Sequence, residues 1–501
     1  MPRHNSIQLM KIQQLAREHQ IIVSSASLLG WDQETYMPEA AASFRAEQLS
    51  WLSARAHELC TSAAWQDALE DASKMTDPSD ITKIACLHEM KRRYNLATKL
   101  PVELVAAETS ASSIAKHAWV QARKDNDYQH FVPHLQGLVD IARQKAELWG
   151  YANEPYDALL DCHERGATTA SISLLFDGLR PKLASLARAA VIRSKSRSIP
   201  LPAGPYPIEN QKIFNELIAQ DIGFDYQAGR IDTTAHPFCT TVGPRDIRLT
   251  TRYEEHDFTS SLFGVLHEAG HGMYEQGLLG TQPGMASDDA VSLGIHESQS
   301  RLWENHVGHS LSFWEKWYPK ACDLFPQLRN FSLADFMNFV QRAEFSPIRV
   351  EADEATYDLH ILLRFDLERL IFRNQLSLTE LPEAWNEAYR ELFGKTPVDN
   401  TQGCLQDIHW AMGAFGYFPT YTLGNLHAAQ LYRAAAKDEN INRSLKAAEY
   451  RPLLRWLREN IHRYGALVDP AELIARATGE APNAKHYLAH LQDRYLAGET
   501  Y

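Results

Sequence analysis

The chain has 501 residues, 45% of them apolar, and a formal net charge of -13. Because nucleic acids and anionic membranes attract basic surfaces, this acidic balance argues against both as partners. The sequence has neither a run of 18 apolar residues nor the apolar core of a signal peptide near its start, so we expect a cytoplasmic protein without a membrane span. Six scattered cysteines with no Cys-x-x-Cys pair favour reduced thiols over a disulfide framework.

Helical periodicity dominates the first part of the chain. The segment Pro133–Gly150 is typical of a helix, with proline at its start and glycine at its end. The strongest break follows at Ser194–Pro207, where clustered prolines predict a surface loop or hinge. We therefore expect one domain over residues 1–501, with an N-terminal helical part at 1–195 and a second part at 208–501.

The pattern changes between residues 233 and 253. Side chains alternate over Thr240–Val242 and Ile247–Tyr253, on either side of the turn residues Gly243 and Pro244. This alternation predicts a short β-hairpin next to the helix that follows it.

That helix carries the most informative pattern of the chain, His-Glu-Ala-Gly-His at residues 267–271. Asp257 or Thr259 is placed to cap its start. On a helix the spacing puts His267 and His271 on one face, where two neutral imidazoles can bind one Zn²⁺. Glu268 then lies beside the metal and is the candidate general base. Gly270 costs the helix about 1 kcal/mol relative to alanine, which indicates a close approach by substrate or by a neighbouring backbone.

A catalytic zinc usually has three protein ligands, so a third must come from elsewhere in the chain. The metzincin pattern is excluded, because Tyr274 and Gly277 stand where it requires glycine and histidine. A second helix is predicted after the loop at 280–284, and it can return Glu297 to the metal. His296 and Glu304 are rivals for this place. Glu275, one turn past His271, is expected to be a solvated carboxylate or a support for a ligand.

At this point the motifs resemble those of the carboxypeptidase Taq family of metallocarboxypeptidases. The resemblance rests on six segments in matching order, two of which are His-Glu-Ala-Gly-His and His296-Glu297-Ser298-Gln299. The other four are His236-Pro237-Phe238, Asp246-Ile247-Arg248-Leu249-Thr250, Ile348-Arg349-Val350-Glu351-Ala352-Asp353 and Gly403-Cys404-Leu405-Gln406-Asp407-Ile408-His409-Trp410. Together with the chain length, they extend the resemblance over essentially the whole protein.

The resemblance implies a mainly α, clam-like metallopeptidase fold with a deep groove and a small β-sheet next to the active-site helix. The part at 1–195 would cover the groove, and 208–501 would be the catalytic half, which contains all the metal-site motifs. It also implies a homodimer and one Zn²⁺ per chain, bound by His267, His271 and Glu297, which Co²⁺ can replace.

Three further residues are assigned by the same resemblance. Arg349 would bind the terminal carboxylate of the substrate with a guanidinium fork. Its alternative is a structural ion pair with Asp353, four residues later. His236 and Tyr421 are candidates for contacting the substrate or its oxyanion, against the alternative that they only pack. Arg248 is expected to pair with Asp246 instead of substrate.

The leading functional hypothesis is a zinc carboxypeptidase with broad specificity that releases residues from the free C-terminus of peptides, with Glu268 as the base. A zinc oligopeptidase that cuts internally in short peptides is the alternative. A helical scaffold without catalysis is the third possibility, and the intact Glu268 argues against it, because binding alone needs no general base.

Overall fold

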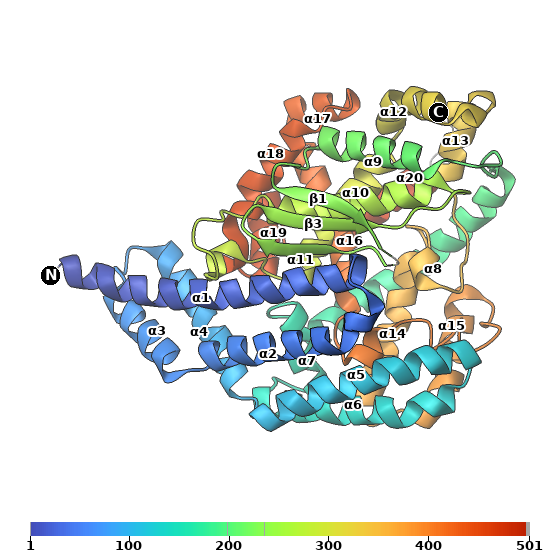
Figure 1. Ribbon diagram of the computed structural model, residues 1–501. Helices are drawn as coiled ribbons and strands as arrows, with labels where there is room; N and C mark the ends of the chain where they lie inside the picture. Colours follow the sequence, from blue (N-terminus) through green and yellow to red (C-terminus); the bar gives the residue numbers. More distant parts are fainter. Residues whose placement is uncertain (1, 198, 235, 497–501) are drawn as a thin grey trace. The chain divides into compact units, whose positions relative to one another are not determined.

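The computed structural model describes residues 2–197, 199–234 and 236–496, which are mostly helical (Figure 1). Their contacts divide the chain into two compact units. Unit 1 comprises Met1–Thr98, Pro200–Met337 and Ala428–Pro482, and unit 2 comprises Lys99–Ile199, Asn338–His427 and Asn483–Tyr501. In the described residues, no helix combines the length and the apolar character that a membrane span requires.

Unit 1 holds the sheet and the predicted metal motifs. Its helices are α1 (Pro2–Thr35), α2 (Ala42–Cys60), α3 (Ala63–Met75), α4 (Ile81–Thr98), α9 (Ile208–Ile222), α10 (Phe258–Glu275), α11 (Leu293–Arg301), α12 (Leu311–Leu324), α17 (Glu439–Lys446), α18 (Arg451–Asn460) and α19 (Pro470–Thr478). Short helical segments are η1 (Glu39–Ala41), η2 (Ala286–Asp288), η3 (Leu302–Gly308), η4 (Pro326–Asn330) and η8 (His462–Leu467).

The described residues of unit 2 form helices joined by turns and coil, and they include no β-strand. Its helices are α5 (Val102–Asp125), α6 (Tyr128–Trp149), α7 (Pro155–His163), α8 (Thr169–Arg197), α14 (Tyr357–Phe372), α15 (Leu381–Phe393) and α20 (Lys485–Tyr495), with the short segments η5 (Arg349–Glu351), η6 (Leu378–Glu380) and η7 (His409–Met412). Two more helices, α13 (Leu333–Val340) and α16 (Pro419–Ala435), contribute residues to both units.

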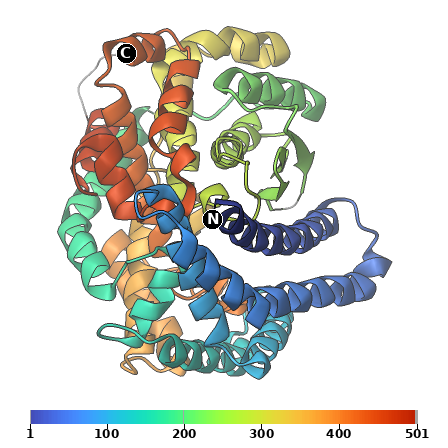
Figure 2. The same ribbon diagram turned by 90° about the vertical axis from the view of Figure 1, so that its left-hand side faces the viewer.

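The sheet of unit 1 has three strands, β1 (Gly229–Thr233), β2 (Cys239–Gly243) and β3 (Asp246–Thr251), in the order β1-β3-β2. β2 and β3 form the predicted antiparallel hairpin, with an irregular register between Thr241 and Gly243. β1 pairs in parallel with β3. Helix α10 packs against β3 and β2, while α1 packs along β2 and beside α2, as Figure 1 and Figure 2 show. The expected mainly α fold with a small sheet next to the metal helix is confirmed.

Helix α10 begins where the sequence predicts. The Asp257 side chain caps it by accepting a hydrogen bond of 2.9 Å from the backbone of Thr259. Leu262 and Leu266 are fully buried on its inner face. A Cβ at Gly270 would lie 2.5 Å from the carbonyl oxygen of Gln299, so glycine is needed because the backbone of α11 crosses here.

Two boundaries predicted from proline were wrong. Helix α6 begins at Tyr128, where Asp127 caps it, and it contains Pro133 instead of starting there. Helix α8 continues to Arg197, so the coil before α9 is shorter than the predicted break. Pro133 lies beyond the first turn of α6, where proline costs one backbone hydrogen bond without ending the helix, so a proline alone does not mark the first helical residue.

Candidate metal centre

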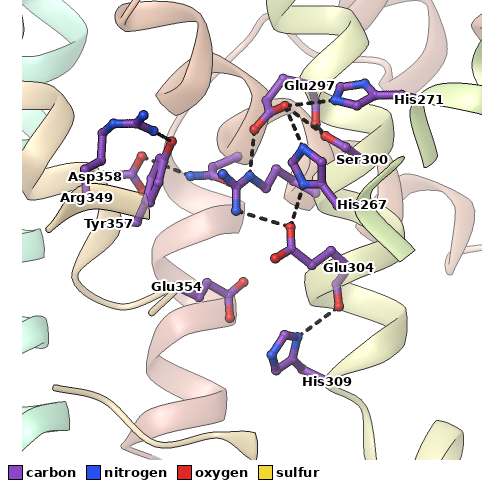
Figure 3. Close-up of polar contacts among 12 residues, drawn as sticks. His267, His271, Glu297, Ser300, Glu304, His309, Arg349, Glu354, Tyr357 and Asp358 are labelled. Atoms are coloured by element: carbon purple, nitrogen blue, oxygen red, sulfur yellow. Dashed lines mark hydrogen bonds and ion pairs between the residues drawn. The ribbon is translucent and has the colours of Figure 1, made fainter. Parts of the chain in front are cut away.

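Three potential ligands converge in unit 1. His267 and His271 come from successive turns of α10, and Glu297 comes from the centre of α11 (Figure 3). The Nε2 atoms of the two histidines lie 3.6 and 3.4 Å from the same carboxylate oxygen, Oε2 of Glu297. Because two imidazole nitrogens and a carboxylate oxygen are preferred zinc donors, and all three atoms lie within 4.8 Å of one another, the group fits a catalytic metal with an open fourth position.

Glu304 and His296, the two rivals for the third ligand position, instead contact the Nδ1 atoms of His267 and His271. Nδ1 of His267 lies 2.8 Å from Oε2 of Glu304. Nδ1 of His271 contacts Nδ1 of His296, whose Nε2 lies 2.8 Å from Glu275. When Glu304 accepts from Nδ1 of His267, the Nε2 atom of that ring keeps its lone pair. When Glu275 accepts from Nε2 of His296, Nδ1 of His296 accepts from Nδ1 of His271, and Nε2 of His271 also keeps its lone pair. Both lone pairs then face Glu297 and can bind a metal ion.

Glu297 is held in place by its own helix. Nε of Arg301, one turn later, donates a hydrogen bond of 2.7 Å to Oε1, and the Ser300 hydroxyl donates one of 2.9 Å to Oε2. Arg301 also donates to Glu304 over 3.2 Å, so one guanidinium joins the ligand to the support of His267. The sequence reasoning missed Arg301 and Ser300, although a polar residue three or four positions after a ligand is the signal that points to them.

The position of Glu304 depends on an unusual backbone. After Arg301 the helix widens into the π-helical segment η3, which contains Glu304. Such segments often occur at functional sites, because one extra residue per turn changes the direction of a side chain. In Figure 3, Glu304 points at His267 while its backbone carbonyl accepts from His309 over 2.9 Å. No local pattern in the sequence marks this widening.

Glu268 differs from the other carboxylates of the site. It is only 7% exposed, and its side chain has no hydrogen bond to another described residue. Burial, reinforced by the negative charges of Glu297 and Glu304 and opposed by His267, raises the pKa of Glu268 to about 7. A carboxylate with this pKa and no fixed partner can both accept and release a proton near neutral pH.

The pKa values of His267 and His271 are shifted in opposite directions. Burial lowers the pKa of His271 to about 4, so its ring is neutral at pH 7 and can bind a cation. Burial also acts to lower the pKa of His267, but Glu297 and Glu304 outweigh it and raise the pKa to about 9. A proton and a metal ion therefore compete for His267.

His236 lies in unit 1, in the connection between β1 and β2, and its side chain is exposed. The nearby Phe238 backbone bonds to the Thr250 hydroxyl over 2.8 Å, which joins this connection to the sheet. Arg248 pairs with Asp246 at 2.9 and 3.0 Å, as the sequence predicts.

Arg349 lies in unit 2, at the start of η5, and is 5% exposed. Its Nε and Nη2 donate to Oδ1 of Asp407 over 3.0 and 2.8 Å. Its Nη1 donates to the Tyr357 hydroxyl over 2.7 Å, as Figure 3 shows. The alternative ion pair with Asp353 does not form, because Asp353 instead accepts from the backbone of Glu344 over 2.7 Å.

Asp407 is shared between two buried arginines. Arg364, which is fully buried, donates from Nε to the other oxygen, Oδ2, over 2.7 Å. Burial alone would raise the pKa of Asp407, but the two guanidinium groups hold it far below its usual value. One carboxylate therefore faces two positive charges. The Arg349 guanidinium also lies 4.9 Å from the ring centre of Tyr421, whose hydroxyl is 3.1 Å from Nε2 of His409.

Comparison with known proteins gives one consistent result. A family model described as carboxypeptidase Taq (M32) metallopeptidase matches residues 11–495. Thermostable carboxypeptidase 1 of Thermus thermophilus is 41% identical over 96% of this chain and 97% of its own length. Among solved structures, an M32 carboxypeptidase from Deinococcus radiodurans and a carboxypeptidase from Pyrococcus furiosus are each 36% identical, with TM-scores of 0.93 and 0.94 over 98% of this chain and 99% of their own.

Proposed function

The chain belongs to the carboxypeptidase Taq (M32) family of metallopeptidases, and we propose that it is a zinc enzyme that removes residues one at a time from the free C-terminus of peptides. Metal-dependent carboxypeptidase activity follows from the family. The choice of zinc is the finer step. It rests on one observation, the convergence of two imidazole nitrogens and one carboxylate oxygen in a partly buried site.

His267, His271 and Glu297 would hold the ion, and Glu268 would act on the attacking water. An ion bound there polarises the substrate carbonyl and makes water more acidic. Glu268 takes the proton of the attacking water and delivers it to the leaving amine. Its buried carboxylate is suited to both steps, because no arginine or serine fixes it in the ionised form as they fix Glu297. Co²⁺ can replace Zn²⁺ in this account, because the same donors accept both ions.

Arg349 would bind the terminal carboxylate of the substrate. Asp407 neutralises only one of its two arginine partners, so this part of unit 2 carries an excess buried positive charge. The contacts to Asp407 and Tyr357 use three of the five N–H groups of Arg349. An anionic substrate group supplies the charge that balances the second arginine.

Tyr421 and His236 would contact the substrate. The Tyr421 ring lies against the Arg349 guanidinium, which supports a contact with the terminal residue. His236 is exposed on a loop joined to the sheet, where an extended peptide is a natural partner. The oligopeptidase alternative is not favoured, since the relatives are carboxypeptidases.

The proposal also covers the location of the protein, its oligomeric state and its specificity. We expect a cytoplasmic homodimer with broad specificity for the terminal residue, in which residues 1–195 cover the substrate groove. Light scattering would then give a mass of twice 56.8 kDa.

A pair of variants tests the metal site and the base separately. Glu297→Ala should lose the metal, because it removes one of three bonds to the ion. Glu268→Gln should keep the metal but lose roughly 10²- to 10⁴-fold in turnover, the usual size of a general-base contribution. Metal content by mass spectrometry and peptide hydrolysis are measured on the same samples. Full turnover in Glu268→Gln, or one zinc per chain in Glu297→Ala, would refute the assignment.

A further inference from the structure

A second candidate binding site, lined by arginine side chains, lies in unit 1 where the end of α9 meets α18. Two overlapping hollows, with volumes of about 190 and 340 Å³, share Gly223, Arg451 and Arg458 in their walls. Arg455 lines the smaller hollow. None of the metal-site residues described above belongs to either lining.

The three arginines form one stripe on α18. Positions 451, 455 and 458 are spaced by four and three residues, so they lie on the same helix face. All three side chains are exposed, and none of them has a hydrogen bond or ion pair with another described residue. This differs from Arg349, Arg364 and Arg301, whose guanidinium groups are all bound to carboxylates.

The positive charges of Arg451 and Arg458 repel each other in this stripe. Although the Arg458 side chain is exposed, the protein atoms packed around it remove part of its solvation and lower its pKa; Asp225 opposes this effect, and the positive charge of Arg451 lowers the pKa further. Asp225 is the acidic residue of the lining, and its carboxylate is also 3.5 Å from Arg245. Three positive charges therefore face one carboxylate that a fourth arginine already shares.

A glycine at the end of α9 forms part of the wall of both hollows. Gly223 ends α9 with a φ of 118°, and a Cβ there would lie 2.4 Å from a methyl carbon of Leu454 on α18. Glycine therefore allows the two helix segments to approach closely, because the Leu454 methyl takes the place of a side chain at Gly223. The larger hollow is at the lower end of the range for small-ligand pockets.

We propose that this hollow binds a phosphate group, either as inorganic phosphate or as the phosphate of a small metabolite. A tetrahedral dianion has enough oxygens for several guanidinium groups at once, whereas a carboxylate has two. Arginine forks match phosphate geometry and stay charged at every physiological pH. In a chain of net charge -13, an unneutralised arginine stripe is also a local attraction for anions.

Isothermal titration calorimetry on the metal-loaded enzyme tests this site, with inorganic phosphate and adenosine monophosphate as separate probes at ionic strength held constant with chloride. Arg451→Gln and Arg458→Gln should each weaken phosphate binding by roughly tenfold or more, because each removes charge-assisted hydrogen bonds. Arg458→Lys should retain part of the affinity. Arg390→Gln, at an exposed position on α15 outside the lining, should bind like the wild type.

The comparison of probes identifies the source of the phosphate. Tighter binding of the nucleotide indicates a metabolite, and equal or tighter binding of inorganic phosphate indicates the free ion. Phosphate that binds at the catalytic metal gives the same signal in every variant and cancels. Unchanged affinity in both glutamine variants, or acetate binding as tightly as phosphate, would overturn the proposal. Since the substituted side chains are exposed, all variants should retain the thermal stability of the wild type.

Discussion

Glu268 and Glu297 are two buried carboxylates near the same pair of imidazoles, yet their surroundings separate their pKa values. Arg301 and Ser300 bind Glu297, whose pKa stays well below the usual value despite burial. Glu268 has no such partner, and burial raises its pKa to about 7. Carboxylates with separated pKa values take different roles, so Glu297 is suited to permanent ligation and Glu268 to proton transfer.

The pH dependence of kcat/KM should follow from Glu268. The base works only when it is ionised, so activity should fall as the pH drops through its pKa. A bound cation favours the ionised form, which makes about 7 the upper limit for this acid limb. Steady-state rates between pH 4 and 8 check this expectation, with metal content measured at each pH because protons also compete at His267. Activity that rises toward pH 4 in fully metal-loaded enzyme would contradict it.

Glu304 should tune the metal without binding it. It accepts from Nδ1 of His267 and so orients the ring whose other nitrogen faces Glu297. Glu304→Ala should weaken metal affinity about 10- to 100-fold, and Glu304→Gln should lose less because it keeps an acceptor. Competition with a chelator measures this affinity. Glu315→Ala, at an exposed position on α12, is the matched control and should bind metal normally. Equal affinity in all three variants would remove Glu304 from the metal site.

At the scale of elements, local patterns predict what local interactions determine. Periodicity and the Asp257 cap locate α10, and alternation locates β2 and β3. The partner strand β1 is not predictable in this way, because its pairing with β3 joins residues some 18 positions apart without a hairpin signal. The widening at η3 likewise depends on packing and has no sequence mark.

The same distinction applies to the site. The spacing of His267 and His271 predicts two ligands, and the returning helix supplies Glu297 together with two rivals. Deciding among these three requires the crossing of α10 and α11 at Gly270, which is a tertiary contact. The role of Asp407 in the Gln-Asp-x-His segment cannot be predicted from the sequence for a similar reason. Asp407 contacts Arg349 from 58 residues away, beyond the reach of any local pattern.

Asp407 should be a structural requirement of unit 2. Asp407→Asn would leave two buried arginines without a counter-ion, and breaking such a pair typically costs about 3 to 5 kcal/mol. Urea unfolding at pH 7 measures the loss, with Asp493→Asn on the exposed face of α20 as the control. The folded pKa of Asp407 is depressed, so its contribution is complete above about 3.9, the value of an unfolded aspartate, and declines as the pH falls further. An unfolding free energy equal to that of the control would contradict this role.

At the scale of the whole molecule, chain order and spatial order differ. The chain alternates between two compact units, each made of three segments, and the candidate metal centre belongs to one of them while Arg349 belongs to the other. The proline-rich stretch near residue 200 is visible in the sequence as a break. The sequence does not show that later segments, such as Ala428–Pro482, pack back into the unit formed by the first residues. The assignment of 1–195 as a cover and 208–501 as the catalytic half therefore stays a prediction.

We propose that metal-dependent cleavage begins at a free C-terminus that Arg349 recognises. Mass-spectrometric time courses on one peptide test it directly, as the free acid and as the C-terminal amide, with and without a chelator. The wild type should produce a ladder shortened one residue at a time from the free acid, spare the amide, and stop when the metal is removed. Arg349→Ala should lose far more activity on the free acid than on the amide, because only the free acid provides the charged partner. Internal fragments, or equal cleavage of both peptides by the wild type, would contradict the account.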